Sequence, residues 1–199
     1  MGEGCIVKVF IRFPESWWGE DADVIGVAMD SNGTDDMGFT FNNSLYQTEM
    51  EKQWWRQLDG FNSVYGQNEI LQGWFIGDAA RFVETLPKEE IQSVLMQVMR
   101  QYLGKAYPNI PNPGNTIVTN WCSDPFTRGV YTGVTMNSRH SDIAALARPL
   151  PNQWNPKMFF AGEATHSSIW ASVTGAWYSG VREARRIVHM FDYDDGDYE

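Results

Sequence analysis

Alternating apolar and polar positions mark the beginning of the chain as a β-strand over residues 5–13. One face of this strand carries only apolar side chains: Val7, Val9, Ile11 and Phe13. Lys8 falls on the opposite face, between Ile6 and Phe10, because successive side chains of a strand point to opposite sides. Pro14 ends the pattern, so we expect a strand with one core face and one mixed face.

The clearest helical periodicity covers residues 87–103. Its apolar residues recur at intervals of three and four, which forms one stripe along a helix: Ile91, Val94, Leu95, Val98, Met99 and Tyr102. Pro87 suits the first turn of a helix, and Gly104 stands where a C-terminal cap belongs. The pattern therefore predicts a helix that packs one face against a core.

Weaker patterns predict short elements in the rest of the chain. Residues 15–48 are rich in Gly, Asp, Asn and Ser, which favours short strands joined by turns, with a hairpin tip at Ser31-Asn32-Gly33. Residues 122–156 look largely irregular. Further elements are expected as strands at 69–75, 117–121 and 157–162, and as helices at 142–147 and 173–190.

The composition is that of a folded protein with an acidic surface. Hydrophobic residues make up 43% of the 199 residues and aromatic residues 14%, which is enough material for a core. The net charge is −10, and five of the acidic residues belong to the tail 192–199, which leaves about −5 for the rest. This charge argues against nucleic-acid binding and is compatible with a cationic substrate.

Several kinds of functional site are not recognised in the sequence. With three histidines, a His-rich metal site is not expected. Cys5 and Cys122 form no spacing motif and fit a reducing compartment or incidental burial. No membrane span or targeting segment is recognised, so we expect the chain in the cytoplasm or an organelle lumen. No Gly-x-Gly-x-x-Gly fingerprint precedes a helix, so a nucleotide-binding βαβ unit is not recognised either.

The segment 159–185 carries the strongest functional pattern. An apolar run ends at Gly162-Glu163, and after a polar loop small residues recur at helical spacing: Gly175, Ala176, Ser179, Gly180 and Ala184. The N–H groups at the start of this helix would stabilise negative charge on a flat cofactor, and Glu163 would accept hydrogen bonds from hydroxyl groups. From the spacing alone, tight helix packing is the favoured explanation of the same small residues.

Three segments, in the same order along the chain, resemble those of flavin-containing amine oxidases, with most similarity to the polyamine oxidase branch. GEATH followed by GAWYSGVREA resembles the C-terminal FAD-binding segment of this family, which also includes histone-lysine demethylases. NWCSDPFTRGVYTG (120–133) resembles the stretch beside the flavin and the substrate. IVKVFIRFPESWW (6–18) resembles the substrate-domain strand that carries a lysine.

The resemblance implies roles for individual residues. Lys8 matches the catalytic lysine that contacts flavin N5 through a water, although the strand pattern alone is also that of a solvated lysine. Trp121 would pack near the flavin ring, or else be an ordinary core tryptophan. Tyr131 matches one aromatic wall of the substrate slot, and Ser172 stands at the position of the second wall, which favours polyamines because some polyamine oxidases carry a small hydroxyl residue there.

Further contacts with FAD follow from the same resemblance. The residues implied, besides Trp121, are Gly162, Glu163, Ser172 and Val173. Thr174 stands where many relatives have histidine, which leaves the substrate class open, and His166 is expected to brace the loop.

The function that the resemblance implies is the FAD-dependent oxidation of C–N bonds of amines, with polyamines as the expected substrates. O2 would be consumed, and an imine or aldehyde and H2O2 would be formed. Two alternatives stay open: a truncated or degenerate paralogue without catalysis, and an oxidase of amino acids or protein lysines on the same fold. The expected partners are a small amine, O2 and a separate N-terminal FAD-binding half, without nucleic acid or membrane.

The expected fold mixes α+β and α/β architecture. A substrate-binding lobe with a mixed sheet and helices would be followed by the last strand and helix of a Rossmann-like FAD-binding lobe. The Pro-rich stretch 108–114 predicts the crossover, so residues 1–112 would belong to the substrate-binding lobe, 113–191 to the segment that contacts substrate and FAD, and 192–199 to an acidic tail. The Met-Gly-Glu-Gly start resembles an internal stretch of the family, so we expect a C-terminal portion that binds FAD weakly or not at all by itself.

Overall fold

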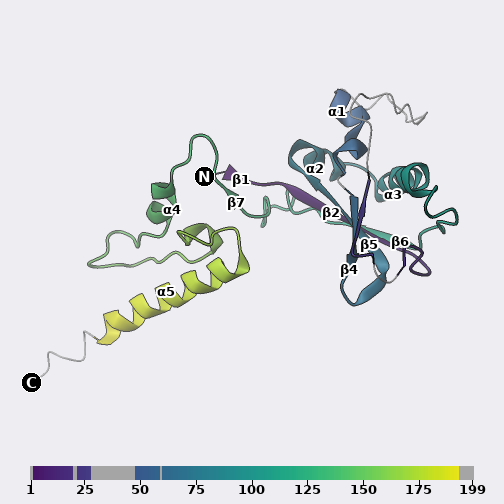
Figure 1. Cartoon of the computed structure of the whole chain (residues 1–199). Helices are drawn as coiled ribbons and strands as arrows, with labels where there is room; N and C mark the ends of the chain where they lie inside the picture. The colour runs from purple at the N-terminus through teal and green to yellow at the C-terminus, as the bar shows by residue number, and fades with distance from the viewer. Residues whose placement is uncertain (1, 20–21, 28–47, 59, 193–199) are drawn as a thin grey trace, which may run out of the picture. The chain divides into compact units, whose positions relative to one another are not determined.

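The structure, a computed structural model, describes residues 2–19, 22–27, 48–58 and 60–192. The chain forms two compact units (Figure 1): the first is Cys5–Gly129, and the second joins Met1–Gly4 to Val130–Glu199. The predicted hairpin tip at Ser31-Asn32-Gly33 and residues 193–199 of the acidic tail lie outside the described residues. Among the described helices, none combines the length and the apolar character that crossing a bilayer requires.

The first unit is built on a five-stranded sheet in the order β3-β4-β5-β2-β6, whose neighbouring strands are antiparallel. The strands are β2 (Ile6–Arg12), β3 (Val24–Gly26), β4 (Gly60–Val64), β5 (Gln67–Ile76) and β6 (Asn115–Val118). The strands expected at 5–13 and 69–75 are confirmed as β2 and β5. The strand expected at 117–121 is confirmed in part, because pairing with β2 ends at Val118.

The core of this unit lies on the face of β2 that the alternation predicts. Val7, Val9 and Ile11 are completely buried there. In the described part of this unit, five helical segments accompany the sheet: α1 (Glu49–Lys52), η2 (Trp54–Gln57), α2 (Gly77–Val83), α3 (Lys88–Val98) and the π-helical turn η3 (Met99–Leu103). α2 packs on β2 and β5, and α3 on β6. The helix expected at 87–103 is confirmed, and its apolar stripe is buried from Ile91 to Met99.

The boundaries between the two compact units do not coincide with the Pro-rich stretch. Residues 108–114 lead from η3 to β6, and β6 pairs with β2 as an edge strand of the first sheet. The boundary expected near residue 112 therefore falls inside the first unit, and the change of unit occurs after Gly129. A sequence pattern shows that the chain turns at a Pro-rich stretch, but not which strand it joins afterwards.

The second unit combines a two-stranded pairing with helices. It contains β1 (Gly2–Glu3), β7 (Thr132–Gly133), α4 (His140–Leu146), the 3-10 turn η4 (Glu163–Thr165) and α5 (Val173–Asp192). The helices expected at 142–147 and 173–190 are confirmed as α4 and α5. The strand expected at 157–162 is not formed: this segment makes one isolated bridge, from Met158 to Leu150. A strand needs a neighbour along its length, and the described part of this unit offers one at that single position.

Candidate functional site

Lys8 lies between two indole rings in the first unit. Its Nζ is 4.3 Å from the ring centroid of Trp74 and 5.6 Å from that of Trp121. The backbone is fixed as well, because the N–H of Lys8 donates to Oγ1 of Thr119 at 2.9 Å and the N–H of Thr119 donates back to the Lys8 carbonyl at 3.0 Å. Cation–π attraction, worth about 0.5–2 kcal/mol, orients an ammonium group in such a position. Lys8 is therefore a half-buried, oriented cation, not a freely solvated one.

Trp74 is a member of this cluster that the sequence analysis missed. It stands directly opposite Lys8 in the antiparallel register of β2 and β5. Both strands are predictable from their alternation, but no hairpin turn joins β2 to β5, so their register is set by tertiary packing. A tryptophan on the mixed face of a predicted strand is the only signal in the sequence that points to it.

Glu163 holds the loop before α5 in the second unit. Its Oε1 accepts hydrogen bonds from the N–H and the hydroxyl of Thr132 at 2.9 and 2.6 Å, and its Oε2 accepts one from the N–H of Ala171 at 2.6 Å. Gly162, with φ of 144°, donates its N–H to the buried hydroxyl of Ser179 at 2.8 Å. Glu163 and Gly162 thus connect the β7 region, the turn η4 and helix α5.

Ser172 is the N-terminal cap of α5. Its Oγ accepts a hydrogen bond from the N–H of Gly175 at 2.9 Å, the geometry of a serine cap. Val173, the first helical residue, is 88% exposed. The expected bracing role of His166 is confirmed, because its Nδ1 accepts the N–H of Ile169 at 3.2 Å.

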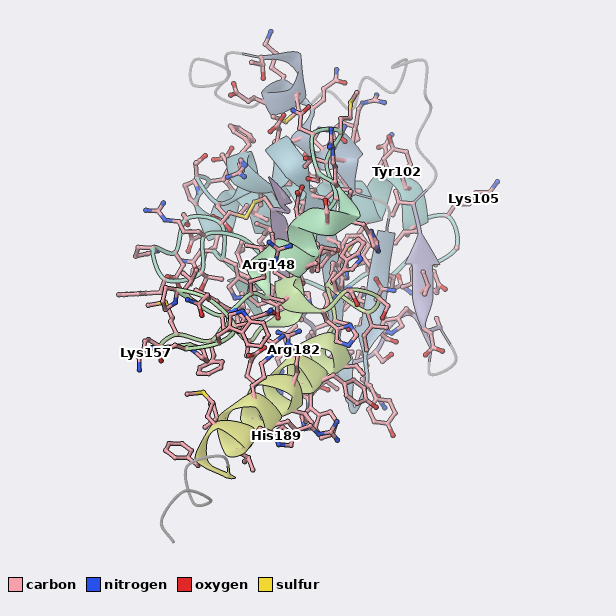
Figure 2. The ribbon with its side chains drawn as sticks, turned by 90° about the vertical axis from the view of Figure 1, so that its left-hand side faces the viewer. Tyr102, Lys105, Arg148, Lys157, Arg182 and His189 are labelled. Carbon is pink, nitrogen blue, oxygen red and sulfur yellow. A yellow bond between two sulfur atoms is a disulfide. The ribbon has the colours of Figure 1, made fainter. Side chains whose placement is uncertain are left out.

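The side of α5 that faces its own unit is polar. Glu183 is 5% exposed and pairs with Arg182 and Arg186. Arg182, which projects from α5 (Figure 2), also donates to the carbonyl oxygens of Thr165 and Phe160 at 2.8 and 3.0 Å. These contacts fix the loop after residue 159 to the helix.

The structure divides the predicted site residues into two groups. Lys8 and Trp121 belong to the first unit, where they lie together with Trp74. The second unit carries the others: Tyr131, Gly162, Glu163, Ser172 and Val173. Tyr131 is 48% exposed, and its carbonyl oxygen accepts the N–H of Gly4 at 3.0 Å.

Two hollows in the surface do not involve these residues. One, of about 970 Å³ in the second unit, is lined in part by Arg148 and His189 (Figure 2) together with Trp154. The other, of about 720 Å³ in the first unit, lies at the far end of β2, around Arg12 and Phe13. None of the predicted site residues lines either hollow.

Within each unit, the chemistry of the residues present is compatible with a flavin. A carboxylate offers about four acceptor positions, so the three donors on Glu163 leave capacity for one hydroxyl of a cofactor. The start of α5 supplies a helix N-terminus beside the small residue Ser172. Lys8 supplies an oriented cation. These are groups that can stabilise a hydroxyl-bearing cofactor with a negatively charged reduced form.

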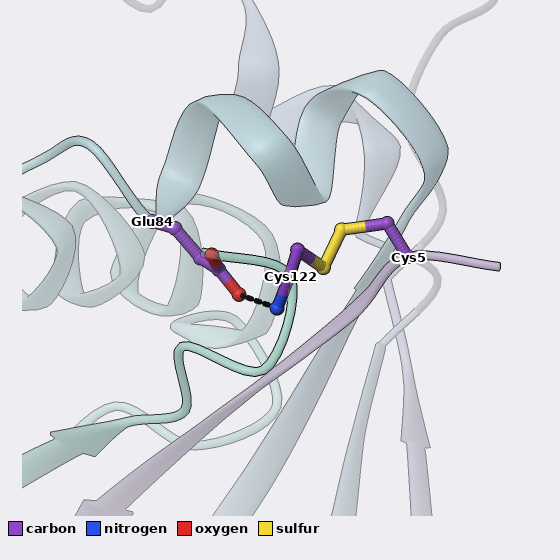
Figure 3. A group of neighbouring side chains, drawn as sticks. All are labelled: Cys5, Glu84 and Cys122. Carbon is purple, nitrogen blue, oxygen red and sulfur yellow. Dashed lines mark hydrogen bonds between the residues drawn. A yellow bond between two sulfur atoms is a disulfide. The ribbon is translucent and has the colours of Figure 1, made fainter. Parts of the chain in front are cut away.

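The two cysteines are joined by a disulfide, which the sequence analysis did not anticipate (Figure 3). Cys5 and Cys122 are 117 residues apart, and their Cα atoms lie 5.7 Å from one another. Spacing could not reveal the pair, because β2 and the segment after β6 are brought together by sheet pairing. With Glu84 they form the one group of possible metal ligands found among the described residues.

Alanine substitution at two glycines of α5 is expected to have opposite effects. A Cβ at Gly175 would lie 2.1 Å from the carbonyl oxygen of Ile169, so Gly175→Ala should lower the free energy of unfolding by about 1–3 kcal/mol. A Cβ at Gly180 meets nothing within 4 Å, so Gly180→Ala should raise it by up to about 1 kcal/mol through helix propensity. Urea unfolding followed by circular dichroism measures both, and shifts of the same sign would contradict the close approach at Gly175.

The solved structures that resemble this chain define its fold class. A triple mutant of putrescine oxidase superposes with a TM-score of 0.63 at 18% sequence identity, over 94% of this chain and 35% of that one. The fold is therefore that of one part of an amine oxidase. The family model described as flavin containing amine oxidoreductase matches residues 3–188, and the chain belongs to this family.

Curated relatives agree with this assignment. The peroxisomal N(1)-acetyl-spermine/spermidine oxidase of Homo sapiens is 32% identical over 197 residues, which are 96% of this chain and 36% of that protein. A possible lysine-specific histone demethylase 1 of Drosophila melanogaster is 31% identical, over 98% of this chain and 20% of that protein. Polyamine oxidase 1 of Oryza sativa is 27% identical, over 96% and 38%. The chain thus spans little more than a third of the length of the human relative.

Proposed function

We propose that this chain is the C-terminal part of an FAD-dependent amine oxidase that acts on polyamines. The overall reaction would oxidise a C–N bond with O2 and give an imine, which hydrolyses to an aldehyde, and H2O2. The observation that carries the proposal is the ammonium of Lys8, held 4.3 Å from Trp74 and 5.6 Å from Trp121. The family match explains why such a lysine would be present.

The residues of this chain would bind, orient and move protons. FAD, when bound, supplies the two-electron chemistry and passes the electrons to O2. Lys8 would hold a water molecule or a proton at its Nζ, and the rings of Trp74 and Trp121 would limit access of other water. Glu163 would accept one hydroxyl of the cofactor. Val173, at the start of α5, would present its backbone N–H to developing negative charge.

Three observations support amines with several positive charges as substrates. Tyr131 exposes half of its surface and can receive a cation on its ring face. The chain carries a net charge of −10, which attracts cations over long range. Relatives at 32% identity are named as oxidases of acetylated spermine and spermidine. The small side chain of Ser172 would leave room for a long aliphatic amine.

We also propose that a nucleotide-binding half covers the outer face of α5. Apolar residues follow one side of this helix and stay exposed: Val173 (88%), Trp177 (64%), Val188 (55%) and Phe191 (68%). The opposite side of the helix is the polar one that contacts its own unit. An apolar stripe of this size normally has a partner. The chain matches 36% of the human relative, so the larger part of that relative lies outside the matched region.

Assembly with such a half tests the proposed function. The chain alone is expected to show no stoichiometric flavin absorbance near about 450 nm. Co-expressed with the N-terminal FAD-binding half of a polyamine oxidase, it should bind flavin and release H2O2 with spermine or acetylated polyamines. Trp177→Asp, on the apolar stripe, should prevent assembly, whereas Arg185→Asp, exposed on the same helix, should not.

The outcomes distinguish the alternatives. Stoichiometric flavin on the chain alone would contradict the need for a second half. Flavin binding without turnover of any amine would favour a non-catalytic paralogue. Turnover of amino acids or methylated lysine peptides in preference to polyamines would favour the substrate class suggested by the names of the histone demethylase relatives.

A further inference from the structure

The Cys5–Cys122 disulfide joins the two segments that carry Lys8 and Trp121. Cys5 directly precedes β2, and Lys8 follows three residues later. Cys122 directly follows Trp121, beyond the last residue of β6 that pairs with β2. The disulfide therefore holds the start of β2 next to the loop after β6. The cation–π contact between Lys8 and Trp121 depends on this proximity.

Glu84 is the second anchor of the same loop. Its Oε1 accepts the N–H of Cys122 at 2.9 Å (Figure 3). Its Oε2 accepts the N–H of Ser123 at 2.8 Å. Glu84 comes from the end of α2. Two anchors of different kinds thus act on this loop: hydrogen bonds to a carboxylate, which involve no sulfur atom, and a covalent bond between sulfurs, which reduction breaks.

The oxidation state of the two cysteines is expected to affect the side chain next to them, Trp121. Cys5 and Cys122 are 4% and 7% exposed, whereas Trp121 is 37% exposed and lies at the margin of the core. Without the S–S bond, the hydrogen bonds to Glu84 and those that Ser123 and Asp124 donate to the Asn120 carbonyl still hold the backbone of this turn. We therefore expect the indole ring of Trp121, and not the turn itself, to move relative to Lys8. Cys5 and Cys122 belong to a large cluster of buried apolar residues, so we expect the unit to stay folded when this bond is reduced.

We propose that Cys5 and Cys122 form a redox modification site whose oxidation state sets the position of Trp121 beside Lys8. The chemical class of the oxidant is a small peroxide: two thiols and one H2O2 give one disulfide and two waters. The S–S bond forms as the O–O bond breaks, and the sulfurs lose the two electrons that the peroxide gains. A dithiol such as dithiothreitol reverses the change and is itself oxidised to a cyclic disulfide.

This redox site does not depend on the proposed function. Cys5, Lys8, Trp121 and Cys122 all belong to the first unit, and the experiment that tests their coupling needs no flavin. The experiment uses the full chain labelled with 5-fluorotryptophan and observed by fluorine NMR. Trp121→Phe and Trp18→Phe assign the two resonances of interest. Trp18 is 4% exposed and lies beyond the far end of β2, so it reports on the fold as a whole.

Reduction by dithiothreitol, verified by titration of two thiols per chain, is expected to shift the Trp121 resonance by more than its line width. The Trp18 resonance should stay in place, and H2O2 should restore the original spectrum. In Cys122→Ser, the Trp121 resonance should have its position in the reduced chain under all conditions. This variant tests the proposal even if the disulfide is too buried to be reduced in the folded chain. Ser123→Ala, which keeps both cysteines, should respond like the wild type.

Three results would overturn the proposal. An unchanged Trp121 resonance, both in the fully reduced chain and in Cys122→Ser, would show that the bond does not position this ring. A joint shift of both resonances would make the bond a general fold constraint. One equivalent of Zn2+ bound by the reduced chain, with Trp121 kept in its oxidised position, would instead assign a metal site to Cys5, Glu84 and Cys122.

Discussion

Replacing Lys8 by methionine is expected to lower kcat of the assembled enzyme by about 10²–10⁴-fold, the range that positioned proton-transfer groups contribute. Methionine keeps the length and apolar stem of lysine but removes the ammonium that Trp74 and Trp121 hold. The loss should appear in kcat more than in KM, because the group acts on the reaction and not on substrate binding. Steady-state release of H2O2 from acetylated spermine measures it.

The matched control for this prediction is Lys105→Met. Lys105 is exposed in the same unit (Figure 2), and its replacement removes one positive charge without touching the cluster. It should leave kcat unchanged. If Lys8→Met kept most of its kcat while flavin content was normal, Lys8 would have a structural role only. The proposed function would then lose the observation that carries it.

Glu183→Ala is expected to lower the free energy of unfolding by about 3 kcal/mol, because it removes the buried carboxylate that two partly buried arginines share. The Glu183 side chain is 6% exposed and pairs with Arg182 and Arg186. Arg186 also donates to the carbonyl oxygen of Ala147 at 2.9 Å, so the carboxylate helps to tie α5 to the end of α4. The two arginine side chains are 27% and 37% exposed, and water therefore offsets part of the loss.

Urea unfolding of the purified chain, followed by circular dichroism, measures this effect. Arg185→Ala is the matched control, since Arg185 lies on the exposed side of the same helix. It should change the midpoint little. Equal midpoints for Glu183→Ala and the wild type would mean that the polar face of α5 does not hold the second unit together.

The local elements of the fold follow closely from the sequence. The alternation over residues 5–13 assigns the core face of β2, since Val7, Val9 and Ile11 must all point to one side. The stripe that begins at Ile91 assigns α3 in the same way. Each assignment needs only the period of the backbone and the tendency of apolar side chains to leave water.

Elements that need a partner far away in the sequence could not be predicted from local patterns. Residues 157–162 have the apolar composition of a strand, but their backbone finds a neighbour only at Met158. The Pro-rich stretch was expected to separate two lobes, yet β6 returns to β2 directly after it. Both errors have one cause: hydrogen bonding between strands depends on chain segments that no local window contains.

For the candidate site, the sequence by itself determined the family, the candidate residues and the mixed face on which Lys8 stands. Tertiary structure decided what surrounds them. The register of β2 and β5 places Trp74 over the ammonium, and the return of β6 brings Cys122 to Cys5. The hydrogen bonds of Glu163 show that it holds its own loop to its neighbours Thr132 and Ala171. The physical reason is that residue type and periodicity are local, whereas cation–π, disulfide and carboxylate contacts need atoms from several segments within a few ångströms.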